Sequence, residues 1–345
     1  MSNFIGHIKN SVLIRIIKNF LELTRGYAIA MTLASCMVIW SFAHYSYYFT
    51  WSNFIILIIA LCLVHMAGNL FDDYIDVKEK IKEGFSLENI TFDTYTPKAR
   101  LIRNKTFSLR RVEIILLILC LLATAAGIYF TYFAGLKVLL FMISGGILLL
   151  YYPFSSKHGT SEMVIGLIYG PLMIMGGNYA LTKSFDLNLL ILSIAIFFST
   201  LVLLHADNIM DWEFDIKNNK KTLAILSGTK LKAIDMLETI IYISYGIIVF
   251  GVIFQILNPF SLYVFLTLPI ATKLITSLKE YIDVKDVKFQ TKWYWGMFEN
   301  WEEIKNNNTE FYMFRFYLAR NYAFWFAFFI MLGTISGPNA GIFSL

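Results

Sequence analysis

Nine runs of apolar residues follow one another along this chain of 345 residues. A run of about twenty apolar residues crosses the ~30 Å hydrocarbon core of a bilayer as an α-helix, whose backbone satisfies its own hydrogen bonds there. The runs cover residues 26–48, 52–71, 112–134, 136–152, 162–182, 187–206, 233–256, 259–278 and 318–340. Only 15% of the residues are charged, against about 25% in soluble domains. The sequence therefore predicts an all-α integral membrane protein with nine transmembrane helices.

Positive charge is distributed unevenly between the two ends of these predicted helices. If the N-terminus is cytoplasmic, the segments on that side are 1–25, 72–111, 153–161, 207–232 and 279–320. Of the 29 Lys and Arg residues, only Lys137 and Lys183 then fall on the opposite side. The positive-inside rule therefore predicts this orientation in the cell membrane, with the C-terminus outside. Residues 1–25 are expected to form an amphipathic interfacial segment before one transmembrane domain over 26–345.

Two clusters of acidic and amide residues follow the second and sixth predicted spans, both on the cytoplasmic side. The first contains Asn69, Asp72, Asp73 and Asp76, and the second contains Asp207, Asn208, Asp211 and Asp215. Residues three and four apart share a helix face, so each cluster is predicted to form one polar stripe. At a helix C-terminus the macrodipole opposes each carboxylate by ~0.3–1 kcal/mol, so these acids need a cation. Carboxylate oxygens are the ligands that Mg²⁺ prefers, which makes it the predicted cofactor.

Basic and aromatic residues accompany the acidic clusters. Metal-bound carboxylates with nearby Lys and Arg are typical of a site that binds a diphosphate. The basic residues around the clusters are Lys98, Arg100, Arg103, Lys105, Arg110 and Arg111 in the first long loop, Lys157 in the short loop after the fourth span, and Lys217, Lys220 and Lys221 after the second cluster. Aromatic residues make up 17% of the chain, and their faces can stabilise a carbocation. Two other interpretations remain: the acids are solvated loop residues, or they serve cation transport, which predicts acids near the bilayer midplane.

The acidic clusters resemble the motifs of the UbiA superfamily of intramembrane prenyltransferases. The first reads Asp72-Asp73-Tyr74-Ile75-Asp76 and is similar to the family's N/D-D-x-x-D motif. The second, Asp207 to Asp215, is similar to D-x-x-x-D, and Lys220-Lys221-Thr222-Leu223 is similar to the K-x-T-L that follows. Residues 100–108 resemble a degenerate R-P-L-x-x-G-x-x-S segment. The resemblance extends over residues 20–275.

Further residues resemble the branch of 1,4-dihydroxy-2-naphthoate polyprenyltransferases, which serve menaquinone biosynthesis. They are Tyr152-Pro153-Phe154, Gly159, Glu162, Gly170-Pro171 and Gly176. Three positions depart from the family: Lys80 replaces a common additional acid, and Leu101 and Lys105 replace a proline and a glycine. These departures leave both acidic motifs in place.

The resemblance implies a UbiA-like helical barrel with cytoplasmic cap loops and a role for each candidate residue. Two Mg²⁺ ions would be bound by Asp72, Asp73, Asp76, Asp207, Asn208, Asp211 and Asp215. The catalytic residues would be Asp73, Asp76, Asp211, Asp215 and Tyr152, with Tyr152 near the reacting prenyl carbon. The diphosphate would be contacted by Asn69, Lys98, Arg100, Lys157, Lys220 and Arg25.

The predicted reaction is Mg²⁺-dependent transfer of an isoprenyl group from an isoprenyl diphosphate to an aromatic acceptor of the quinone-precursor type. An intramembrane terpene cyclase needs no acceptor and is the first alternative. A glycerol-phosphate-type acceptor is another, and a cation or metabolite transporter is the alternative of a different class. The predicted partners are these small molecules and the bilayer, with no nucleic acid. The long segment 279–320, which contains Trp293, Trp295 and Trp301, is expected to cover the cytoplasmic mouth as an interfacial helix pair.

Overall fold

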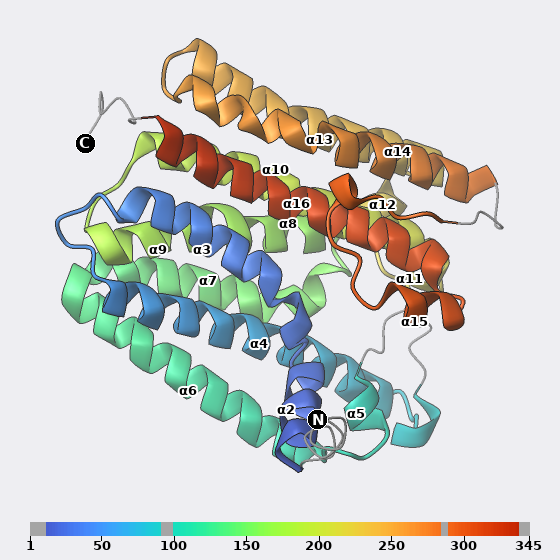
Figure 1. Cartoon of the computed structure of the whole chain (residues 1–345). Helices are drawn as coiled ribbons and strands as arrows, with labels where there is room; N and C mark the ends of the chain where they lie inside the picture. Colours follow the sequence, from blue (N-terminus) through green and yellow to red (C-terminus); the bar gives the residue numbers. More distant parts are fainter. Residues whose placement is uncertain (1–11, 91–98, 284–288, 338–345) are drawn as a thin grey trace, which may run out of the picture. The chain divides into compact units, whose positions relative to one another are not determined.

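All regular elements in the described part of the chain are helical (Figure 1). The computed structural model describes residues 12–90, 99–283 and 289–337. Eight helices in these ranges are long and apolar enough to cross a membrane: Trp51–Lys82 (α4), Leu109–Ala134 (α6), Leu136–Ser155 (α7), Ser161–Thr182 (α8, η3 and α9), Leu187–Met210 (α10), Lys230–Ile253 (α13), Pro259–Ile282 (η4 and most of α14) and Glu310–Ser336 (α16). The prediction of an all-α, multi-pass membrane protein is confirmed.

The first predicted span differs from the other eight. Residues 26–48 contain a 3-10 turn, Gly26–Ile29 (η1), and an α-helix of 14 residues, Ala30–Ala43 (α3). Arg25 precedes the turn with φ of 49°, in the left-handed region, so helix α2 (Val12–Leu23) does not continue into it. At 1.5 Å per residue, α3 is about 21 Å long, which is shorter than the ~30 Å hydrocarbon core. Eight of the nine predicted spans therefore reach full length.

Two spans extend well beyond their predicted bounds. Helix α4 continues to Lys82, although the apolar run ends at residue 71, and α16 begins at Glu310, ahead of the apolar run at 318. Hydropathy detects the part of a helix that lies in hydrocarbon, whereas polar residues can continue the same helix into the interface. The first acidic motif therefore lies inside α4.

The contacts within the chain define two compact units, of which the first comprises Met1–Ala30 and Ile59–Ala126. Its described part contains α2, most of α4, the turn Leu87–Asn89 (η2), the short helix Arg100–Arg103 (α5) and the first two-thirds of α6. Its core includes Leu70, Val77, Ile90, Ile102 and Val112, all buried. These residues come from α4, the end of η2, α5 and α6, and their burial fixes these elements around the first acidic motif.

The second unit comprises Met31–Ile58 and Gly127–Leu345. Helix α10 packs against α8, α13 and α16, and α16 also packs against η4 and α14 (Figure 1). The N-terminus of α10 is capped by Asp186, whose carboxylate accepts from the backbone N–H of Asn188 at 2.7 Å. Gly170 allows η3 (Ile168–Leu172) to approach α10, because a Cβ there would lie 2.7 Å from the carbonyl oxygen of Ser193.

Short elements connect the long helices α10, α13, α14 and α16. They are Trp212–Lys217 (α11), Leu223–Leu226 (α12), Trp293–Trp295 (η5), and Trp301–Asn306 (α15). The predicted interfacial helix pair in segment 279–320 is wrong for its described part. That part contains the ends of α14 (Leu268–Asp283) and α16, the single turn η5 and the six-residue helix α15.

Candidate functional site

The first acidic motif lies on one continuous helix, as its spacing predicts, but not at a helix C-terminus. Asp72 and Asp73 are buried and Asp76 is half-buried on α4. The last turn of α4 carries Lys80 and Lys82 instead. The macrodipole argument is therefore wrong for this motif, and a cation is needed because the carboxylates are buried.

Asp73 is bound by protein groups at both carboxylate oxygens. Its Oδ1 forms an ion pair with Nη2 of Arg25, and its Oδ2 accepts a hydrogen bond from the backbone N–H of Ala99 at 3.1 Å. The same Arg25 nitrogen lies 3.7 Å from Oδ2 of Asp72. One guanidinium group thus compensates charge on two adjacent acids and connects the end of α2 to α4.

The other residues of this unit that are predicted to contact the diphosphate differ in their partners. Arg100 donates from Nε and Nη2 to the two carboxylate oxygens of Glu22, each at 2.8 Å, and its side chain is half exposed. The amide nitrogen of Asn69 donates to the carbonyl of His65 at 3.1 Å. Lys98 lies outside the described residues. Within this unit the structure brings Arg25 to Asp72 and Asp73, whereas Arg100 pairs with α2.

The second motif lies where α10 ends and the chain turns. Asp207 and Asn208 are in the last turn of α10, Asp211 follows it with φ of −87° and ψ of 13°, and α11 then begins. The prediction of acids at a helix C-terminus is correct for this motif. The prediction of one continuous stripe is wrong beyond Asp211, because Asp215 belongs to the next helix, α11.

Asp215 is 2% exposed and has two partners in the following segment. Lys220 places its Nζ 3.4 Å from Oδ1, and the hydroxyl of Thr222 donates to Oδ2 at 3.3 Å. Burial raises the pKa of Asp215, because desolvation of the carboxylate outweighs the opposing effects of Lys220 and Thr222. Lys220, which is predicted to contact the diphosphate, thus lies beside the second motif.

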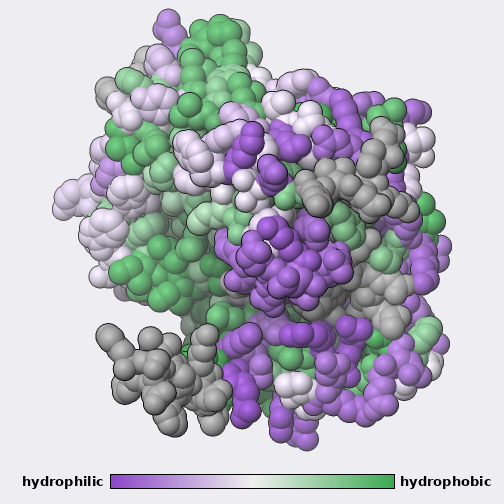
Figure 2. Space-filling view, turned by 45° about the vertical axis from the view of Figure 1, so that its right-hand side comes forward, coloured by the Kyte–Doolittle hydropathy of each residue, from purple (hydrophilic) through white to green (hydrophobic). Residues whose placement is uncertain are grey.

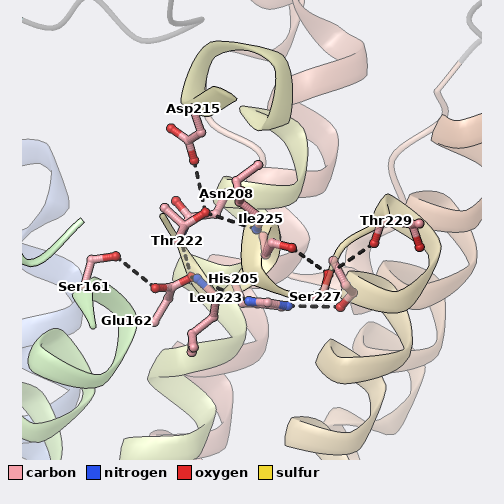
Figure 3. Close-up of polar contacts among 12 residues, drawn as sticks. Ser161, Glu162, His205, Asn208, Asp215, Thr222, Leu223, Ile225, Ser227 and Thr229 are labelled. Carbon is pink, nitrogen blue, oxygen red and sulfur yellow. Dashed lines mark hydrogen bonds and ion pairs between the residues drawn. The ribbon is translucent and has the colours of Figure 1, made fainter. Parts of the chain in front are cut away.

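Glu162 on α8 is a fully buried carboxylate that binds the second motif (Figure 3). Its Oε1 accepts from the amide nitrogen of Asn208 at 2.6 Å and from the backbone N–H of Leu223 at 3.0 Å. Its Oε2 accepts from the hydroxyl of Ser161 at 2.9 Å. Glu162 therefore connects α8, the end of α10 and the start of α12.

A buried histidine on α10 completes this network (Figure 3). Nε2 of His205 donates to the carbonyl of Ala233 at 3.0 Å, and its Nδ1 lies 3.6 Å from Oε1 of Glu162. Because a carbonyl oxygen only accepts, the proton on Nε2 is assigned by this contact. Sequence reasoning gave Glu162 and His205 no role in the site. The resemblance was the only signal for Glu162, and nothing marked His205.

Tyr312 on α16 is a further residue that the sequence did not indicate. It is 1% exposed, and its hydroxyl donates to Oδ1 of Asp207. The two residues are 105 positions apart in the chain, so neither spacing nor composition connects them. The contact fixes one carboxylate of the second motif against the last long helix.

The loop between α7 and α8 also reaches the segment after the second motif. The carbonyl of Ser156 accepts from the backbone N–H of Lys221 at 2.7 Å. Tyr152 is half-buried near the end of α7, and Lys157 is exposed with its Nζ 6.0 Å from the centre of the Phe154 ring. The structure thus places the loop that carries Lys157 beside the Lys220–Leu223 segment.

The polar atoms of these motifs fit a hard cation. Within residues 12–90, 99–283 and 289–337, no three His, Cys, Asp or Glu side chains are grouped so that they alone could bind a metal. Mg²⁺ usually takes one or two carboxylates, water and substrate phosphate oxygens, so it does not require such a group. Asn208 donates its amide nitrogen to Glu162, which leaves its amide oxygen for a cation. The available ligands are therefore oxygens, as Mg²⁺ prefers.

Hydrophilic residues gather in the middle and on the right of the face that Figure 2 shows, and hydrophobic residues lie on its left and at its top. Together, the apolar helices and the buried acids with their basic partners define a multi-pass membrane protein that carries two charged motifs. The chain belongs to the UbiA prenyltransferase family, whose profile matches residues 28–298. The predicted family is confirmed.

Two curated relatives match parts of the chain. The 2-carboxy-1,4-naphthoquinone phytyltransferase of Synechocystis sp. is 30% identical over 125 residues, which cover 36% of this chain and 40% of the relative. The UbiA prenyltransferase domain-containing protein 1 of Rattus norvegicus is 28% identical over 189 residues, 54% of each chain. The matched regions thus span about half or less of these relatives.

Solved structures share the fold over nearly the whole chain. A UbiA homologue from Archaeoglobus fulgidus bound to GPP and Mg²⁺ has a TM-score of 0.57, with 14% identity, and covers 92% of this chain and 99% of its own. A structure of digeranylgeranylglyceryl phosphate synthase has a TM-score of 0.60, also with 14% identity, and covers 93% and 99%. At this identity the likeness shows the fold alone.

Proposed function

We propose that this protein transfers an isoprenyl group from an isoprenyl diphosphate to an aromatic acceptor of the quinone-precursor type, with Mg²⁺ as cofactor. The observation that carries the proposal is the pairing of buried acids with basic groups in both motifs of a UbiA-family chain. Arg25 binds Asp73 in the first motif, and Lys220 lies beside Asp215 in the second. Such pairs of acidic and basic groups suit a metal-bound diphosphate.

In this proposal the oxygens of both motifs bind two Mg²⁺ ions. The proposed ligands are Asp72, Asp76, Asp207, Asn208, Asp211 and Asp215. Asp73, the seventh predicted ligand, is assigned a different task, because both of its oxygens already bind Arg25 and Ala99. Asp73 then positions Arg25 toward the diphosphate. The other proposed diphosphate contacts are Asn69, Lys98, Arg100, Lys157 and Lys220, and Tyr152 lies near the reacting carbon.

The reaction breaks the allylic C–O bond of the donor, and the diphosphate leaves with the bonding electrons. Bound Mg²⁺ would neutralise charge on the leaving group. Arg25 and Lys220 would donate hydrogen bonds to its oxygens, which stabilises the developing charge. The apolar helices exclude water from the allylic cation, and a ring carbon of the acceptor captures it and then loses its proton. Glu162 accepts a hydrogen bond from the amide nitrogen of Asn208. This bond fixes the Asn208 side chain with its amide oxygen directed away from Glu162.

The acceptor class rests on two supports. The relative from Synechocystis is named as a naphthoquinone phytyltransferase, and Gly159, Glu162 and Gly176 resemble the naphthoate branch. Glu162 is the member of this set that touches the second motif. The charge asymmetry of the sequence supports an orientation with the N-terminus and both motifs in the cytoplasm and the C-terminus outside.

The test is turnover by purified protein in lipid nanodiscs, with a panel of isoprenyl diphosphates, Mg²⁺ and 1,4-dihydroxy-2-naphthoate. We expect a prenylated naphthoate by mass spectrometry, loss of product with EDTA and recovery with Mg²⁺. Asp211→Asn should abolish product, whereas the matched control Asp235→Asn, at an exposed position on α13, should keep activity within about twofold, as is typical of surface changes.

Other outcomes of the same assay would contradict the proposal in distinct ways. A hydrocarbon formed without acceptor would indicate a terpene cyclase. A product formed only with a glycerol phosphate would indicate a different acceptor class. Ion or metabolite flux in liposomes that depends on Asp211, without diphosphate release, would indicate a transporter.

A further inference from the structure

We propose that residues 289–300, here called the re-entrant segment, lie in the membrane leaflet nearest the second acidic motif and contact lipid through Trp293, Tyr294 and Met297. The sequence assigns this stretch to a cytoplasmic loop. The inference depends on the placement of the helices in a membrane and not on the proposed reaction.

Contacts with α16 place the re-entrant segment along this helix. Tyr312, near the start of α16, is level with Asp207 at the end of α10, because the two side chains are hydrogen-bonded. Asn321 lies nine residues further along the same helix, which is about 13 Å at 1.5 Å per residue. Its amide nitrogen donates to the carbonyls of Trp295 at 2.9 Å and Met297 at 3.0 Å. The re-entrant segment thus packs on α16 about 13 Å along the helix from the level of Asp207, within the apolar run of this span.

Protein side chains satisfy the backbone carbonyls of the re-entrant segment. Irregular backbone at membrane depth is tolerated where protein groups satisfy it. Besides the two bonds from Asn321, Arg320 donates from Nη2 to the carbonyl of Met297 at 3.0 Å, and Tyr317 donates its hydroxyl to the carbonyl of Glu299 at 3.0 Å. Side chains of α16 therefore replace the water that a solvated loop would use.

The close fit on α16 also depends on one glycine. Gly296 has φ of 95°, in the left-handed region that favours glycine. A Cβ at this position would lie 2.6 Å from the amide nitrogen of Asn321. The segment follows α16 in Figure 1, where η5 also contacts α14. Its inner face is thus fixed to two membrane helices.

The opposite face is aromatic and basic. Trp293 is 89% exposed, Tyr294 42% and Met297 56%. The Nζ of Lys292 lies 5.6 Å from the centre of the Tyr294 ring. Trp and Tyr with a neighbouring Lys are typical of the membrane–water interface, where the rings contact acyl chains and the ammonium group reaches headgroups. Because α14 and α16 are membrane spans, this face continues their lipid-facing surface, and lipid is its proposed occupant.

The test is site-directed spin labelling in liposomes that contain anionic lipid. Labels are placed at Trp293→Cys and Met297→Cys, whose side chains are exposed, so that packing is not disturbed. The control is Asn306→Cys at the exposed end of α15, and the three native cysteines are replaced by alanine. We expect the ratio of collisions with oxygen to collisions with a water-soluble nickel complex to be several-fold higher at the two test positions than at the control.

Equal ratios at all three positions would overturn the proposal, because the segment would then lie in water. A label shielded from both reagents would also overturn it, since protein rather than lipid, such as a second copy of the chain, would cover this face. A second measurement, of tryptophan fluorescence, is made on proteins that keep their native cysteines. Brominated lipids should quench less of the tryptophan emission in Trp293→Phe than in the unchanged protein. Equal quenching in the two proteins would contradict lipid contact by Trp293.

Discussion

The ion pair between Arg25 and Asp73 should be energetically coupled, and its loss should destabilise the first unit. Asp73→Asn leaves an amide whose NH₂ group faces either the Arg25 guanidinium or the Ala99 N–H, both of which are donors. Arg25→Gln removes the cation from Asp72 as well, 3.7 Å away. Each single variant therefore leaves a buried group with a poor partner.

The expected size follows from burial. The side chains of Asp73 and Arg25 are 5% and 24% exposed. Removing one partner of a fully buried pair costs ~3–5 kcal/mol, but here partial exposure of Arg25 and the nearby Asp72 reduce the loss. A coupling free energy of ~1–2 kcal/mol is expected, within the range found for contacting residues.

The assay is a double-mutant cycle on the free energy of unfolding, measured by SDS titration in mixed micelles. The four proteins are the unchanged chain, Arg25→Gln, Asp73→Asn and the double variant. The control cycle uses Lys105→Gln and Glu88→Gln, an ion pair in the same unit whose side chains are 61% and 70% exposed. No measurable coupling is expected for that exposed pair.

Additive effects of Arg25→Gln and Asp73→Asn, within ~0.5 kcal/mol, would refute the reasoning. Asp73 would then have no special relation to Arg25, and its assignment as a positioning residue would fail. Because the readout is stability, this result would not bear on whether the protein transfers prenyl groups.

Three further predictions concern the second motif. Glu162→Ala should lower turnover at least tenfold by releasing the amide of Asn208. Glu162→Gln should recover most of the turnover, because the glutamine oxygen can accept the same bonds; an equal loss of turnover in both variants would argue against positioning of Asn208 by Glu162. Tyr312→Phe should raise the Mg²⁺ concentration for half-maximal activity at least ~tenfold, since a hydrogen bond to a charged group contributes ~1.5–3 kcal/mol. An unchanged Mg²⁺ titration would contradict the importance of its bond to Asp207. Asp215→Asn should raise the thermal midpoint in EDTA, because burial disfavours its charged carboxylate at neutral pH, while abolishing turnover; a lowered midpoint would contradict this.

Local composition was enough to predict which segments cross the membrane. Eight of the nine apolar runs form helices long enough to span it, because a long stretch with very little charge has few other stable environments. The two acidic motifs were equally visible, since their spacing is a property of neighbouring residues. The bounds of α4 and α16 were not, because polar residues continue both helices beyond the apolar runs.

The sequence by itself thus determined the class of protein, the helices and the acids that need a cation. Only the tertiary structure decided which groups meet those acids. Arg25 and Asp73 are 48 residues apart, Glu162 and Asn208 are 46 apart, and Tyr312 and Asp207 are 105 apart. These contacts form when the helices pack, and no periodicity within one helix specifies its neighbour. For the same reason, the position of residues 289–300 depends on carbonyl contacts with α16 that hydropathy does not register.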